Sequence, residues 1–169
     1  MDALFHFIFA LAGGYILLKG LNIKFNSFIL IFLALCSLLI DIEHVFELMG
    51  IFEYIKLHTL ITITIPLLIL MIFYLMKKGS YELYGYLLTL SVMLFGAVVA
   101  DMIKGMYGVP LFYPLSDTLY MIPKNREIYF LNKPGMPIVS VYGIAMLIYF
   151  GLIGLIISGK KLLESGKLK

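Results

Sequence analysis

The sequence predicts an all-α fold, a polytopic (multi-pass) bundle of about five transmembrane helices. Hydrophobic residues make up 62% of the 169 residues, the mean hydropathy is +1.03, and the apolar residues form long runs separated by short polar turns. Soluble domains are only about 45–50% apolar. The bilayer is therefore the expected solvent, and residues 1–169 are expected to form a single transmembrane domain.

Five apolar runs can cross the hydrocarbon core, which takes about 20 residues per helix. The first two runs are short and reach this length with flanking residues such as Lys19, whose aliphatic stem can lie along apolar surface. Between them, Ser27 is expected to cap the second helix, and residues 77–80 form the polar turn after the third. The expected spans are residues 3–19, 27–44, 57–76, 83–103 and 137–158.

Basic residues are distributed unevenly between the two ends of this bundle. One end has eight lysines against Glu82 and Glu164, whereas the other has five basic residues against eight acids. Cytoplasmic loops are enriched in Lys and Arg, so the N-terminus is expected outside and the C-terminus in the cytoplasm. Residues 108–135 then form an external loop, which is apolar enough to lie on the membrane interface or fold back over the helix ends.

The charge pattern also limits the partners. The net charge is only +3, and the basic residues lie between apolar runs rather than in a stripe that could follow phosphates, so no nucleic-acid partner is expected. The expected partner is the lipid bilayer of the cell (inner) membrane. Cys36 is the single cysteine, which excludes an internal disulfide and indicates a packing role.

Histidines and carboxylates gather at the expected outer end of the bundle, because alternation of helix direction brings the start of one span beside the end of the next. Asp41 and His44 are three residues apart and share a helix face, whereas Glu43 is expected to point elsewhere. Ionisable groups at the membrane cost a few kcal/mol unless they are paired or bound to metal. The residues at this end are His6, Asp41, Glu43, His44, Glu47, Glu53, His58 and Asp101.

A mixed set of histidines and carboxylates suits a divalent metal ion, with zinc as the first candidate. Such a site activates water when one coordination position stays open. Among the nearby acids, Glu43, Glu47 or Glu53 is expected to act as a catalytic base or to orient a ligand.

Simpler roles stay open for each of these residues. His6 and His58 are amphipathic and, taken singly, suit the headgroup level of a membrane. Asp101 is at helical spacing from Lys104, and an ion pair explains it equally well. The acids between residues 43 and 56 suit the wet face of an amphipathic stretch.

Several short motifs extend over residues 4–114. They are His6, Leu39-Ile40-Asp41-Ile42-Glu43-His44, Leu57-His58-Thr59, and Ala100-Asp101-Met102 followed by Gly108-Val109-Pro110-Leu111-Phe112-Tyr113-Pro114. In these motifs the chain resembles the bacterial and archaeal family of membrane-bound metal-dependent hydrolases that includes the LexA-binding inner-membrane protein. The resemblance implies hydrolysis, with His6, Asp41, His44, His58 and Asp101 as metal ligands.

Two positions depart from the pattern of that family. Glu53 stands where the family has a histidine, and Ala97 stands where a histidine is expected four residues before Asp101. Glutamate can bind a metal, but alanine cannot. The resemblance therefore implies a site with fewer ligands, a site that lacks one metal of a larger set, or a member without activity.

The sequence thus predicts a membrane-embedded, metal-dependent hydrolase that acts on an ester or phosphoester of a lipid-like, amphiphilic substrate at the outer membrane face. The alternative is a non-catalytic integral membrane protein in which the same residues form a polar or ion-paired cluster, and Ala97 favours it. A transporter is disfavoured because the chain has no pair of interrupted spans.

Overall fold

The computed structural model describes residues 3–43, 46, 49–50, 56–103, 108–122, 128–129 and 137–166. The described chain is helical, as predicted. A short antiparallel ribbon of β1 (Ile128–Tyr129) and β2 (Pro137–Val139) precedes the last helix. The helices are α1 (Ala3–Gly20), α2 (Ser27–Ser37), the 3-10 helix η1 (Leu38–Asp41), α4 (Leu60–Leu75), α5 (Tyr81–Asp101) and α6 (Val141–Glu164).

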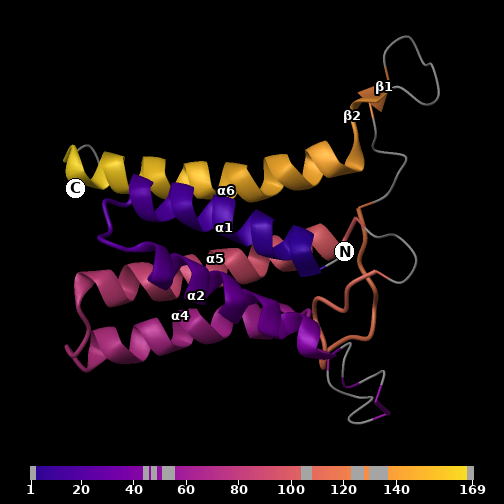
Figure 1. The fold of residues 1–169 in the computed structure, drawn as a ribbon, viewed down its shortest axis with the longest axis horizontal. Coiled ribbons are helices and arrows are strands. Elements are labelled where there is room, and N and C mark those ends of the chain that lie inside the picture. Colours follow the sequence, from indigo (N-terminus) through magenta and orange to yellow (C-terminus); the bar gives the residue numbers. More distant parts are fainter. Residues whose placement is uncertain are drawn as a thin grey trace.

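The helices lie side by side in one bundle, with the two termini at opposite ends (Figure 1). The turns from α1 to α2 and from α4 to α5 lie at the end where α6 finishes, which we name the C-terminal end. The starts of α1, α4 and α6 and the ends of η1 and α5 lie at the other end, which we name the N-terminal end. Neighbouring segments of the chain therefore cross the bundle in alternating directions.

Helix α5 occupies the centre of the bundle, since it contacts α1, α2, α4 and α6. Its small residues allow close approach of its neighbours, as is typical of helix packing in membranes. Gly96 of α5 faces the fully buried ring of Tyr149 on α6, and Gly13 of α1 faces the same ring. The ring of Tyr149 thus packs α6 against both α1 and α5.

Polar side chains fix where the helices begin, and the helix bounds differ from several of the expected spans. Asn26, not Ser27, caps α2, because its side-chain oxygen accepts a hydrogen bond from the Ile29 amide at 2.9 Å. The last helix begins at Val141 rather than at residue 137, because residues 137–139 pair in the ribbon and Ser140 caps the helix.

The outer surface of the bundle is apolar. In the described residues, α5 and α6 are long and apolar enough to cross a membrane, whereas the segments Leu4–Gly20, Ser27–Asp41 and Leu60–Leu75 are apolar but shorter. Large hydrophobic side chains are exposed along α2, α4 and α6, in a number that soluble monomers rarely show. They include Phe28, Phe32, Leu68, Leu75, Leu147 and Leu155.

We expect Gly96→Ala to lower the free energy of unfolding by about 1–3 kcal/mol, because overpacking a full core forces its neighbours to move. A Cβ at this position would lie 2.5 Å from Cε2 of the buried Tyr149 ring. Gly154→Ala is the matched control, since its Cβ would meet nothing within 4 Å. Thermal unfolding in detergent, followed by circular dichroism, measures both. Equal melting of Gly96→Ala and wild type would contradict this packing.

Candidate metal centre

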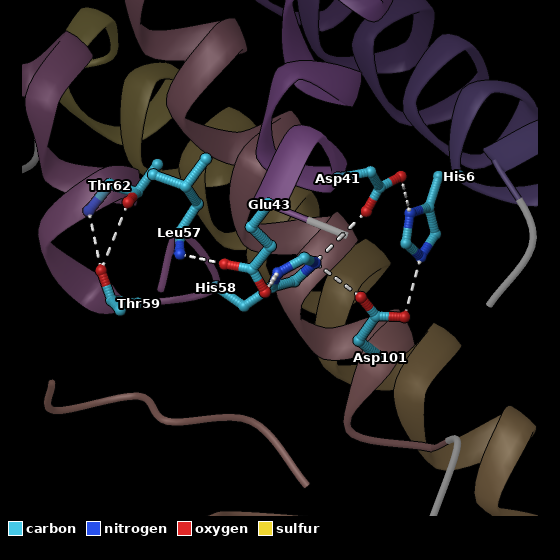
Figure 2. A network of polar contacts seen from close by, with 8 residues as sticks. All are labelled: His6, Asp41, Glu43, Leu57, His58, Thr59, Thr62 and Asp101. Atoms are coloured by element: carbon cyan, nitrogen blue, oxygen red, sulfur yellow. Dashed lines mark hydrogen bonds and ion pairs between the residues drawn. The ribbon is translucent and has the colours of Figure 1, made fainter. Parts of the chain in front are cut away.

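Five side chains from four separate segments of the chain meet at the N-terminal end of the bundle (Figure 2). His6 comes from α1, Asp41 from the last residue of η1 and Asp101 from the last residue of α5. Glu43 follows η1 by two residues, and His58 precedes α4. Alternation of helix direction predicted that these residues share one end, and the structure brings them into contact.

The Asp101 carboxylate lies between the two histidine rings (Figure 2). Its Oδ1 is 3.2 Å from His6 Nε2, and its Oδ2 is 2.6 Å from His58 Nε2. Asp41 also joins both rings, with Oδ2 at 2.9 Å from His6 Nδ1 and Oδ1 at 3.3 Å from His58 Nε2. Two rings and two carboxylates therefore form one closed group.

Each ring is oriented by a carboxylate at its Nδ1 atom. His6 Nδ1 donates to Asp41 Oδ2 at 2.9 Å, and His58 Nδ1 donates to Glu43 Oε1 at 2.7 Å. Both Nε2 atoms then face Asp101. Metal-binding histidines are usually held in this way, with the second ring nitrogen on a carboxylate and the first left for the ion.

Glu43 contacts and orients the ring of His58. The expectation that Glu43 points away from the cluster was therefore wrong. The His58 ring separates the two acids, and its opposite nitrogens reach Glu43 on one side and Asp41 on the other. The second Glu43 oxygen accepts the backbone amide of Leu57. Since both oxygens are engaged, the geometry favours the orienting role of Glu43 over that of a catalytic base.

The rings are almost fully buried, at 2% exposed for His6 and 3% for His58. Carboxylate oxygens of Asp41, Glu43 and Asp101 lie within 3.3 Å of the His58 ring nitrogens and stabilise its charged form. Without a metal, this ring is therefore an imidazolium among carboxylates.

A divalent ion could replace two ring protons without changing the charge of the cluster. Two protonated rings against the carboxylates of Asp41, Glu43 and Asp101 leave one net negative charge. Two neutral rings with one divalent ion leave the same charge. Metal binding at such sites is coupled to proton release in this manner.

The residues fit a divalent ion. Donor atoms that share a zinc ion at about 2.0–2.2 Å lie roughly 3–4 Å apart, and the ligand atoms of His6, Asp41 and Asp101 all lie within 4.8 Å of one another. Among the described residues, His6 Nε2 and Asp41 Oδ1 are buried without a hydrogen-bond partner. Their close contacts are ionic, so a shared cation would satisfy both atoms.

Other predicted site residues lie outside the described part of the chain. They are His44, Glu47, Glu53 and Lys104, so the expected His44 ligand, the expected Glu53 base and the alternative pair of Asp101 with Lys104 stay predictions. Ala97 is described, and it packs with Ile40 and Val98 in an apolar cluster one turn before Asp101. Apolar packing fills the position where the sequence resemblance led us to expect a histidine.

Residues 108–122 fold back over this end of the bundle. The Leu60 amide donates to the Leu111 carbonyl, and the Ile122 amide donates to the Met102 carbonyl, both at 2.9 Å. The segment closes on itself through the bridge between Val109 and Tyr120. It thereby covers the start of α4 and the end of α5.

Sequence reasoning missed the side chains that hold the turn before α4. Thr59 caps this helix, and its Oγ1 atom accepts the Thr62 amide at 3.3 Å (Figure 2). The signal was present, because a threonine just before an apolar run is typical of a helix start. This cap fixes the backbone directly after His58.

A model of the YdjM inner membrane protein family matches residues 1–163. Neither a curated protein nor a solved structure matches the chain. The match includes all five residues of the cluster.

We expect Asp101→Asn to lower the free energy of unfolding by about 3 kcal/mol, since removing one partner of a buried ion pair leaves the other charge uncompensated. Asp117→Asn removes an exposed carboxylate at the same end of the bundle and should change stability by no more than about 0.5 kcal/mol. Thermal unfolding of both variants in detergent is the measurement. Asp101→Asn melting together with Asp117→Asn would contradict the ion-pair geometry.

Proposed function

Since the chain belongs to the YdjM inner membrane protein family, we propose that it is a membrane-embedded hydrolase that uses a divalent metal ion bound at the N-terminal end of the bundle. One observation carries the proposal. Both buried rings have Nδ1 held by a carboxylate and Nε2 turned toward Asp101, which is the arrangement of metal-binding histidines.

The metal ligands in this proposal are His6, Asp41, His58 and Asp101. Zinc is the first candidate because it accepts imidazole nitrogen and carboxylate oxygen together. When bound, such an ion supplies activation of water for attack on an ester or phosphoester. Glu43 keeps Nε2 of His58 directed into the site, and Glu53 is retained as the proposed base.

The segment over the site favours an amphiphilic substrate. Its exposed side chains include Leu115, at 89% exposed, and Phe112, at 44%. Apolar side chains of this size partition into the membrane interface. A lipid-like molecule could therefore reach the cluster from the bilayer, at the outer face if the five segments span the membrane with the N-terminus outside.

A separate observation favours a second function: the charges inside the cluster compensate one another without a metal ion. Three carboxylates compensate the His58 charge without a metal, and Ala97 replaces one expected ligand with apolar packing. In this alternative the protein is non-catalytic, and the ion-paired cluster has a structural role: it stabilises the packing of the helices at the end of the bundle.

We expect the detergent-purified protein to hold about one equivalent of zinc, manganese or iron by elemental mass spectrometry. Asp101→Asn should lose the metal, and Glu43→Gln should bind it roughly 10–100-fold more weakly, as for other residues that orient a ligand. Asp117→Asn is the control and should match wild type. Wild-type protein that takes up no metal after incubation with these ions would rule out the metal centre.

Hydrolysis is tested separately on the metal-loaded protein. A fluorescent lipid ester and a lipid phosphodiester are offered to wild type, to Asp101→Asn and to Asp117→Asn. Turnover by wild type and Asp117→Asn but not by Asp101→Asn supports the hydrolase. If the metal-loaded protein hydrolyses neither the lipid ester nor the lipid phosphodiester, the structural role of the cluster is favoured.

The orientation yields a further prediction, in a Cys36→Ser background. A cysteine introduced by Leu115→Cys should react with a membrane-impermeant maleimide in intact cells, because residue 115 lies at the end expected outside. A cysteine introduced by Lys78→Cys should react only after permeabilisation. The reverse labelling pattern would show that the N-terminus lies inside rather than outside. Equal labelling of the two cysteines in intact cells would contradict the proposal that α5 spans the membrane.

A further inference from the structure

The C-terminal end of the bundle, opposite the candidate metal centre, contains a basic cavity of about 390 Å³. It lies at the turn between α1 and α2, which Figure 1 places beside the end of α6. The lining residues are Lys19, Asn22, Ile23, Lys24 and Phe25.

Neighbouring helices hold the backbone of this turn in place. Asn22 adopts a positive φ of 54°, and the Ile23 amide donates back to the Leu18 carbonyl at 3.0 Å. Tyr81 Oη of α5 donates to the Leu21 carbonyl, and Tyr86 Oη donates to the Lys24 carbonyl. These contacts fix the backbone that forms the cavity wall.

The cavity carries positive charge that the described residues do not compensate. Lys160, close by, lies 3.5 Å from Glu164, whereas in the described part of the chain neither Lys19 nor Lys24 has a carboxylate within ion-pair distance. Two unpaired ammonium groups on a fixed turn attract an anion.

Two aromatic rings lie beside the exposed side chain of Lys19, which lines the cavity. Its Nζ lies 5.9 Å from the centroid of the Tyr15 ring and 5.7 Å from that of Phe25. Cation–π contacts of this kind orient an ammonium group while leaving its N–H donors available. Aromatic side chains beside lysines are typical of the headgroup level of a membrane.

We propose that this cavity binds a phosphate group, that of an anionic phospholipid in the leaflet facing the C-terminal end. Basic pockets between membrane helices bind anionic headgroups, and the Asn22 carboxamide adds a donor beside the two lysines. A soluble phosphate compound offers the same chemistry. The site is independent of the metal centre and of hydrolysis.

Native mass spectrometry tests the proposal on the full chain, with titrated phosphatidylglycerol in about 0.15 M salt, where distant charges are screened. Lys19→Gln/Lys24→Gln should weaken binding about twenty-five-fold, since each lysine contributes a factor of about five. Lys77→Gln/Lys78→Gln removes the same charge from the same end but outside the cavity, and should weaken binding less than about threefold under this screening. Metal content and melting temperature should stay unchanged in both variants.

Phosphatidylcholine with the same acyl chains and glycerol 3-phosphate distinguish the outcomes. Weaker phosphatidylglycerol binding by Lys19→Gln/Lys24→Gln, but not by Lys77→Gln/Lys78→Gln, supports a lipid ligand. Binding of glycerol 3-phosphate with the same dependence on Lys19 and Lys24 supports the phosphate site but assigns it a soluble ligand. Equal losses in the two double variants, or phosphatidylcholine binding as tightly as phosphatidylglycerol, would overturn the proposal.

Discussion

The carboxylate of Asp101 holds the N-terminal end of the bundle together because its two oxygens face two different buried rings. His6 belongs to α1 and His58 to the segment before α4, so this single contact links three parts of the chain. Each ring is nearly inaccessible to water, and an isolated charge at such depth is costly. The positions of Asp41 and Glu43 follow from this constraint, since they complete the compensation of the two rings.

The central helix makes that contact possible. Asp101 ends α5, and the residues before it are small or branched and buried against all the neighbouring helices. Ala97 is part of this surface. A histidine at position 97 would have to displace this apolar packing. The number of ligands and the packing of α5 are therefore linked.

The elements that the sequence predicted correctly depend on simple periodic rules. Long apolar runs identified the helices, and alternating direction placed His6, Asp41, His58 and Asp101 at one end. Other features depend on contacts between distant segments. The orientation of Glu43 is set by the ring of His58, which lies fifteen positions later in the chain, and spacing along one helix carries no such information. The basic cavity was likewise hidden, because the turn that builds it is fixed by tyrosines of α5.

The ring of Tyr149 has a consequence for biosynthesis. It fills the space between Gly13 and Gly96, yet α6 follows the other described helices in the chain. A ribosome delivers residues in sequence order, so the two glycine faces emerge long before their shared aromatic partner. The earlier helices are therefore made before the ring that fills the space between Gly13 and Gly96. Loss of α6 through premature termination would leave the surfaces around both glycines without the ring that covers them.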